Sequence, residues 1–382
     1  MPLNFKYSRE NTVGIEMEVQ LVDKNSLGLT NTSTNIIDAI GGYNDSIKHE
    51  LMMSNLEVNT KVCLNIDEAA KDLYEKFNIV IDEAANHDTL ICSAGTHPFS
   101  HWKDQVFTKD DRYQRLMNNL CIIARRFNVF GLHVHIGVSS GEKCIYIMNK
   151  LLYYIPHLLA LTANSPLWNG EITGLASYRT KVFESLPTAG LPFYFKDWED
   201  YSTLVNNFIA TGTIETIREI WWDIRPHNNF GTVEIRVCDA PSNLREVLAI
   251  ASLIQALVNK IGIDFDNGAV GGSSHPSVVR ENKWRAARFG LNGEFITKGG
   301  NATISVKKAI SDLVASVEAN AKQLGSLNYL SYIDNILNKG DGAARQLNEL
   351  KKRGDVNAVV AYLSGKFTSD VKSQISGGSM MS

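Results

Sequence analysis

The sequence lacks several features of secreted proteins. Its 382 residues include only five cysteines, and no two of them form a C-x-x-C pair. This pattern is typical of free thiols in a reducing compartment, and not of a disulfide framework or a zinc knuckle. The first residues, MPLNFKYSRENT, also lack the charged start and apolar stretch of a signal peptide. We therefore expect a cytoplasmic protein.

Long apolar runs and an excess of positive charge are also absent. The most apolar stretch, residues 247–258, is much shorter than a bilayer span and contains Ser252 and Gln255. The net charge is −3, which gives no general attraction to nucleic acid. Neither a P-loop nor a G-x-G-x-x-G fingerprint occurs. We expect small-molecule partners, with neither a membrane nor a nucleic acid among them.

Up to about residue 240, the spacing of apolar residues predicts alternating strands and helices. In NTVGIEMEVQLVD (11–23) apolar residues occupy every second position, which is typical of a strand with one buried face. GTVEIRVCDAP (231–241) has the same pattern. Helical spacing covers residues 67–87, 112–128, 141–164 and 242–262. Pro156 is expected to bend or break the third of these helices.

Beyond residue 300 the pattern is mostly helical. We predict an α+β protein with a main domain at residues 1–300 and a helical C-terminal extension at residues 301–375 packed on it. Residues 376–382 contain glycine and serine and are predicted to form a disordered tail. A homodimer is our expectation for the oligomeric state, although no sequence pattern favours it.

Four segments carry aliphatic residues on one face and large polar residues on the other. The polar residues are Glu16 and Glu18, then Asn55, Glu57 and Asn59, then His133 and His135, and finally Glu234 and Arg236. One such strand alone is typical of a water-exposed sheet face. The four together contain no lysine, and their carboxylates would repel one another by up to roughly 4 kcal/mol per close pair. They indicate a site for Mg²⁺ or Mn²⁺, which Glu50 could join across a turn.

Arginines and other polar donors occur in the neighbouring segments. The candidates are Arg179, Lys181, Arg225, Asn228, Arg285 and Arg288. The forked donors of arginine match the paired oxygens of phosphate and carboxylate groups. Divalent cations together with arginines suggest a nucleoside triphosphate held without a P-loop. Each of these residues alone is more often part of a surface or structural ion pair.

A series of motifs resembles the carboxylate–amine ligases of the type-2 glutamate–cysteine ligase family, and the motifs occur in the family's order. They are GIEMEVQLVD (14–23), SAGTHPF (93–99), RY (112–113), GLHVHIG (131–137), ANSPLW (163–168), SYRTKVF (177–183), PTAG (187–190) and TVEIRVCD (232–239). Jointly they are specific and cover roughly residues 10 to 295. The helical C-terminal part resembles the family less distinctively.

The resemblance implies a glutamine-synthetase-like fold for the catalytic domain, residues 1–300. Such a fold has an antiparallel sheet with a concave, metal-lined face and helices packed behind it. By position, the implied metal ligands are Glu16, Glu18, Glu50, Glu57, Glu234 and one of His133 and His135. The family commonly has a third glutamate where this chain has Met17. Because Met17 points to the packed face by the strand period, its presence should leave the metal face intact.

The implied reaction is phosphorylation of a carboxylate by ATP, followed by displacement of phosphate by an amine. Glutamate and L-cysteine are the family's nominal substrates. We expect Mg²⁺ (or Mn²⁺) on the glutamates to hold the phosphates, and Arg236 to stabilise the transferring phosphoryl group. Arg179 and Arg225 are candidates for the substrate carboxylates or the phosphates. The remaining candidates for contact with the nucleotide are Lys181, Asn228, Arg285 and Arg288.

Several alternatives stay open at this point. His135, a glutamate or water could take the proton of the amine, and His97 is as readily a structural loop histidine as a catalytic one. An H-x-H strand with a distant glutamate also fits a mononuclear iron oxygenase, although the surplus glutamates and arginines argue against it. A phosphotransferase of the guanidino-kinase type shares the general fold. A metal-binding regulator without catalysis is disfavoured by the completeness of the polar face.

Overall fold

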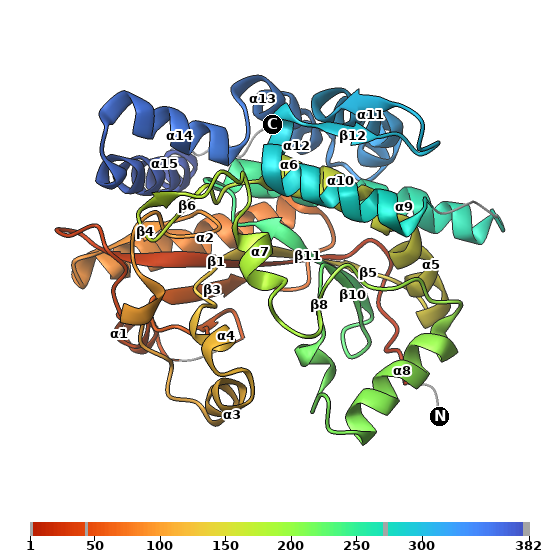
Figure 1. The fold of residues 1–382 in the computed structure, drawn as a ribbon, viewed down its shortest axis with the longest axis horizontal. Coiled ribbons are helices and arrows are strands. Elements are labelled where there is room, and N and C mark those ends of the chain that lie inside the picture. Colours follow the sequence, from red (N-terminus) through yellow and green to blue (C-terminus); the bar gives the residue numbers. More distant parts are fainter. Residues whose placement is uncertain (1–2, 43–44, 270–273, 377–382) are drawn as a thin grey trace.

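The computed structural model describes residues 3–42, 45–269 and 274–376. Its main feature is a seven-stranded antiparallel sheet with the strand order β10-β11-β5-β1-β3-β2, in which β4 pairs with β1 as well. The strands are β1 (Val13–Asp23), β2 (Ile47–His49), β3 (Asn55–Asn59), β4 (Thr89–Cys92), β5 (Gly131–Gly137), β10 (Ile224–His227) and β11 (Thr232–Asp239). Figure 1 shows this sheet crossing the middle of the molecule.

The alternation in β1 divides its side chains as predicted. Val13, Ile15 and Met17 are at most 1% exposed and belong to the hydrophobic core, whereas Glu16 and Glu18 point to the opposite face. The strand register then aligns polar residues of neighbouring strands. Glu18 lies opposite Glu57, and Glu16 lies opposite His133. The sheet therefore has one apolar face and one polar face, as the period of two requires.

Helices cover the apolar face. They include α2 (Ile66–Asn86), α5 (Gly141–Leu151), α6 (Ile155–Thr162) and α9 (Leu244–Asp266). Residues 141–162 and α9 are long and apolar enough to span a membrane, but 72% and 89% of their most apolar windows lie buried inside the protein. They therefore match core helices. The five cysteines are free, as predicted, and only Cys121 is exposed.

Two predicted helices are interrupted. Residues 112–128 were expected to form one helix, but they form α3 (Asp111–Leu120) and α4 (Ile122–Arg125), because Cys121 between them has a φ of 51°. The expected helix at residues 141–164 is divided into α5, the 3₁₀ helix η2 (Leu152–Tyr154) and α6. Pro156 lies in the first turn of α6, where its missing N–H group costs nothing.

The C-terminal segment is helical and shares the core of the sheet. It comprises α11 (Val306–Gln323), α12 (Leu327–Ser331), α13 (Ile333–Lys339), α14 (Gly342–Arg353) and α15 (Val356–Ser376). Phe367 of α15 packs edge-on against Phe77 of α2, with ring centroids 5.0 Å apart. Ile310 and Phe367 belong to the same hydrophobic cluster as the sheet. Ser376 ends α15, and the rest of the expected tail lies outside the described residues.

Shorter elements connect these layers. They are the helices α1 (Ser33–Ala39), α7 (Arg179–Phe183), α8 (Trp198–Ala210) and α10 (Pro276–Phe289), the 3₁₀ helices η1 (Trp102–Asp104), η3 (Ile217–Glu219) and η4 (Gly290–Asn292), and the strands β6 (Leu167–Trp168), β7 (Glu171–Ile172), β8 (Ala189–Gly190), β9 (Trp221–Trp222), β12 (Glu294–Ile296) and β13 (Thr303–Ser305). In Figure 1, α3 and α8 lie on the side of the sheet away from α9 and the C-terminal helices.

Candidate active site

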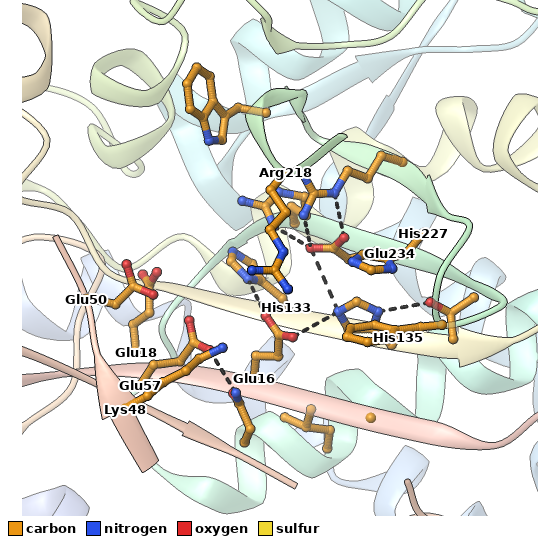
Figure 2. Close-up of a pocket in the computed structure, with 18 of the residues that line it drawn as sticks. Glu16, Glu18, Lys48, Glu50, Glu57, His133, His135, Arg218, His227 and Glu234 are labelled. Carbon is orange, nitrogen blue, oxygen red and sulfur yellow. Dashed lines mark hydrogen bonds and ion pairs between the residues drawn. The ribbon is translucent and has the colours of Figure 1, made fainter. Parts of the chain in front are cut away.

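The polar face of the sheet forms the floor of a cavity of about 710 Å³. Figure 2 shows how its acidic and histidine side chains converge from separate strands. The sequence-predicted residues that line it are Glu16, Glu18, Glu50, Glu57, His133, His135, Arg179, Arg225, Glu234 and Arg236. Within this cavity the carboxylates form two groups of different electrostatic character.

The first group, here called the acidic trio, consists of Glu18, Glu50 and Glu57. One carboxylate oxygen from each lies within 4.8 Å of the others. Burial, together with the neighbouring Glu57, raises the pKa of Glu18 to about 7 against the opposing field of Arg179. Burial and Glu57 also raise the pKa of Glu50 well above its usual value. Three crowded carboxylates with raised proton affinity are a good fit to a divalent cation, which would replace the protons.

One cation forms an ion pair with the acidic trio among the residues that the structure describes. Lys48 of β2 lies opposite Glu57 in the strand register, and its Nζ is 2.8 Å from Glu57 Oε1. The sequence analysis was right that its four polar segments contain no lysine, but it did not predict this strand. The reason is that β2 is only three residues long, too short for its alternation to be recognised.

The second group, here called the arginine-clamped group, consists of Glu16, His133 and Glu234, which offer ligand atoms within 4.8 Å of one another. Burial opposes ionisation of Glu234, but Arg225 and Arg236 outweigh it and hold its pKa well below the usual value. Burial likewise opposes ionisation of Glu16, but His135 and His133 hold its pKa low. Both carboxylates are therefore ionised at neutral pH.

The two histidines of β5 have different surroundings. Burial, together with Arg236, lowers the pKa of His133 to about 4, which keeps its ring neutral as metal ligation requires. Burial also acts on His135, but Glu234 and Glu16 raise its pKa above the usual value. Nδ1 of His135 bonds to Thr232 Oγ1 at 3.0 Å, and its Nε2 lies 3.2 Å from Glu16. His133 is therefore the better candidate for a ligand.

The two arginines of the clamp differ in how many of their donors are free. Arg225 donates through Nε to Glu234 at 2.7 Å and through one terminal nitrogen to the carbonyls of Ile217 and Ile220. Arg236 donates to Glu234 Oε1 through one terminal nitrogen, and its Nε has no hydrogen-bond partner among the described residues. Arg225 therefore ties the loop near η3 to Glu234, while Arg236 keeps donors for a bound group.

The terminal nitrogens of Arg179 donate hydrogen bonds to the backbone. They each lie 3.3 Å from a carbonyl oxygen, those of Val237 and Arg236, at the point where the pairing of β11 with β5 shifts register. A Cβ atom on Gly131 would lie 2.2 Å from Arg179, so only glycine leaves room for this guanidinium. Arg179 thus stabilises the irregular backbone that carries Arg236.

Four predicted residues are not brought into the cavity. Lys181 pairs with Glu184, and Arg285 pairs with Glu281 on its own helix. The guanidinium of Arg288 lies over the ring of Phe289, and Asn228 donates to the backbone of Asn4. None of the four lines the cavity, so they are not carried into the proposed nucleotide site. His97 is buried and hydrogen-bonded to the Leu27 carbonyl, which matches the structural reading.

Several lining residues were not among the sequence candidates. Besides Lys48, they include Arg112 on α3, Arg218 on η3 and His227 at the end of β10. The side chains of Arg112 and Arg218 have no ion pair with a carboxylate among the described residues, and Figure 2 shows Arg218 directed into the pocket. The RY motif at residues 112–113 gave a signal for Arg112. No local pattern marked Arg218.

Comparison with solved structures identifies the fold. A glutamate–cysteine ligase from Francisella tularensis, solved in complex with AMP, superimposes with a TM-score of 0.68 at 14% identity, covering 99% of this chain and 97% of that one. A bifunctional glutathione synthetase from Pasteurella multocida gives 0.73 at 14% identity over 95% of this chain, which spans 53% of that protein. These likenesses show that the chain has the fold of the two ligases.

Sequence relatives identify the family. The chain is 40% identical over 366 residues to a Gloeobacter violaceus protein named "Putative glutamate--cysteine ligase 2", covering 95% of this chain and 98% of that one. It is 42% identical over 369 residues to a similarly named protein of Frankia casuarinae. The sequence model of glutamate–cysteine ligase family 2 matches residues 12–362. The chain belongs to this family, which confirms the resemblance, and neither the oxygenase nor the phosphotransferase alternative gains support.

Proposed function

We propose that the protein joins a glutamate-type carboxylate to an amine such as L-cysteine, with Mg²⁺ or Mn²⁺ holding the phosphates of ATP. The observation that carries the proposal is the presence of two separate three-ligand groups, both with carboxylates, in one cavity beside Arg236. The glutamate–cysteine ligase name of the relatives supports the choice of substrates.

In this proposal each group holds one ion. Glu18, Glu50 and Glu57 would hold the first, and Glu16, His133 and Glu234 the second. When bound, the ions neutralise the phosphate oxygens so that an anionic carboxylate can approach them. A surplus of carboxylates of this kind has no use in a mononuclear iron site, which takes two histidines and one carboxylate.

The remaining residues of the cavity orient the reacting groups. A carboxylate oxygen attacks the γ-phosphorus while the bond to ADP breaks, and the amine then displaces phosphate from the resulting acyl phosphate. Arg236 would stabilise the transferring phosphoryl group, because it lies beside Glu234 with its Nε free. Arg112 and Arg218 join Arg179 as candidates for the anionic ends of the substrates, because Arg179 lines the cavity and its Nε has no partner among the described residues. Arg225 is engaged by Glu234 and by the carbonyls of Ile217 and Ile220.

His135 is better suited to positioning than to accepting the proton of the amine. Its Nδ1 bonds to Thr232, and its Nε2 lies between Glu16 and Glu234 at 3.2 and 3.8 Å. An imidazole in this place would keep both carboxylates available to hold a second ion. The proton of the amine then passes to water or to a leaving phosphate oxygen.

The test is a screen for ADP release with Mg²⁺, ATP, glutamate and a panel of amines that includes L-cysteine. We expect ADP and an amide to form in equal amounts with at least one amine, and both to disappear with a chelator or with Glu234→Gln. Absence of amide with every amine, or formation of a stable phosphorylated metabolite in its place, would overturn the proposal.

A further inference from the structure

Lys48 occupies a place in the cavity that is fixed by strand register. Lys48 of β2 lies directly opposite Glu57 of β3, which in turn lies opposite Glu18 of β1. Three adjacent strands thus place a lysine and two glutamates in one row on the polar face. A lysine that reached the acidic trio by chance from the protein surface would not share this alignment. Its position is as strongly specified as the positions of the ligands.

The contacts of Glu57 show how this row is held. Oε1 of Glu57 accepts from Lys48 Nζ at 2.8 Å and from Asn59 Nδ2 at 2.9 Å. The Glu57 side chain is only 5% exposed, and that of Lys48 is 28% exposed. Glu57 also offers a carboxylate oxygen within 4.8 Å of those of Glu18 and Glu50, so the lysine adjoins the group that would hold a cation.

The charge balance of the acidic trio depends on Lys48. Three ionised carboxylates and one ammonium have a net charge of −2, which one divalent cation cancels. Without the lysine, the acidic trio with a bound divalent cation would keep a net charge of −1 and would repel an anionic substrate. The arginine-clamped group differs, because Glu234 is compensated by two guanidinium groups.

We propose that Lys48 is the internal counter-charge of the acidic trio: it weakens the binding of a free divalent cation there and keeps the loaded group neutral toward the carboxylate substrate. The first effect concerns metal affinity and needs no substrate. The second rests on the proposed ligase function. Lys48 therefore acts as a specificity-determining residue for an anionic acceptor of the phosphoryl group.

Titration of the full-length protein with Mn²⁺, followed by the EPR signal of free Mn²⁺, tests the first effect. Lys48→Met should tighten one of the Mn²⁺ sites by on the order of ten-fold or more, because it removes a positive charge close to the ion. Lys48→Arg should bind as the wild type does. Lys61→Met is the matched control, since Lys61 lines the same cavity but is exposed and has no ion pair among the described residues; less than two-fold change is expected.

The Mn²⁺ effect of Lys48→Met should vanish in a Glu50→Gln background, in which the trio site itself is lost. Unchanged or weaker Mn²⁺ binding in Lys48→Met, with a melting temperature close to that of the wild type, would overturn the proposal. Such a result would show that Lys48 only orients Glu57 and does not affect the binding of the cation.

Steady-state kinetics test the second effect. Lys48→Met should raise the KM for glutamate at least ten-fold, with a smaller change in kcat, and Lys48→Arg should restore it. A fall in kcat at constant KM would overturn this part. If no substrate pair supports turnover in the wild type, the proposed function fails, while the Mn²⁺ measurement still decides the role of Lys48 in metal binding.

Discussion

The acidic trio and the arginine-clamped group consist of similar residues on the same sheet, yet they respond to burial in opposite ways. Burial raises the pKa of Glu18 against the field of Arg179, and it raises the pKa of Glu50 against the field of Lys48. Burial also opposes the ionisation of Glu234, but Arg225 and Arg236 outweigh it and lower its pKa. The comparison shows that the number of neighbouring cationic side chains decides whether the pKa of a buried carboxylate is raised or lowered.

The largest difference between the groups is expected from neutralising one carboxylate in each. Glu234→Gln leaves Arg225 and Arg236 buried without their counter-ion, which should destabilise the fold by roughly 3–5 kcal/mol. ADP release should fall by about 10²- to 10³-fold as well. Glu50→Gln removes a repelling charge, so it should reduce ADP release while leaving the melting temperature equal or higher. A lower melting temperature for Glu50→Gln than for Glu234→Gln would contradict the comparison.

Arg236→Lys should lower ADP turnover by roughly ten- to a hundred-fold, because a point charge cannot both pair with Glu234 and present a forked donor to a phosphoryl group. The measurement is kcat at saturating ATP. Arg225→Lys serves as the contrasting variant: it should mainly lower the melting temperature, since Arg225 joins Glu234 to the loop carbonyls. Wild-type kinetics for Arg236→Lys would remove Arg236 from the reaction.

The acidic trio should make the stability of the metal-free protein depend on pH. The pKa of Glu18 is about 7 in the folded protein against an ordinary value of 4.5, so the folded state binds more protons between these values. Stability should therefore fall as the pH rises from about 4.5 to about 7. Thermal melts in a chelating buffer would show this slope, and Glu18→Gln should flatten it. A slope that is unchanged in Glu18→Gln would show that other groups cause it.

The smallest effect is expected outside the cavity. Arg288→Ala removes an arginine that resembled a phosphate ligand in sequence but lies on α10 against Phe289. Less than a two-fold change in ADP release is expected. Arg218→Ala is its counterpart within the cavity and should raise the KM for ATP or for the acid substrate. Equal effects of the two substitutions would erase the distinction between cavity and surface arginines.

Much of the fold followed from local patterns. The alternation in β1 and β11 separated core residues from polar ones, and the helical spacing located α2 and α9 within a few residues. The break at Pro156 was also expected, because proline lacks a backbone donor. The break at Cys121 was not, since a positive φ at a non-glycine residue leaves no compositional trace.

The sequence predicted the residues of the candidate site less completely than the fold. Glutamates and histidines on regular strands were found because their period of two puts them on one face. Lys181 and Arg285 do not line the cavity, and a positive charge near a motif does not by itself show whether its side chain reaches the site. Lys48 and Arg218 were missed for the opposite reason: they lie on elements of only three residues each, which have no period to recognise.

The sequence by itself determined which side chains share a face of each strand, since that depends only on the alternation of neighbouring residues. It also determined the family, through the order of its motifs. Only the tertiary structure decided that the carboxylates form two groups, that Lys48 pairs with one group and two arginines with the other, and that Arg179 donates to backbone carbonyls. These facts depend on the register between strands that are distant in sequence, and register is set by the packing of the whole sheet.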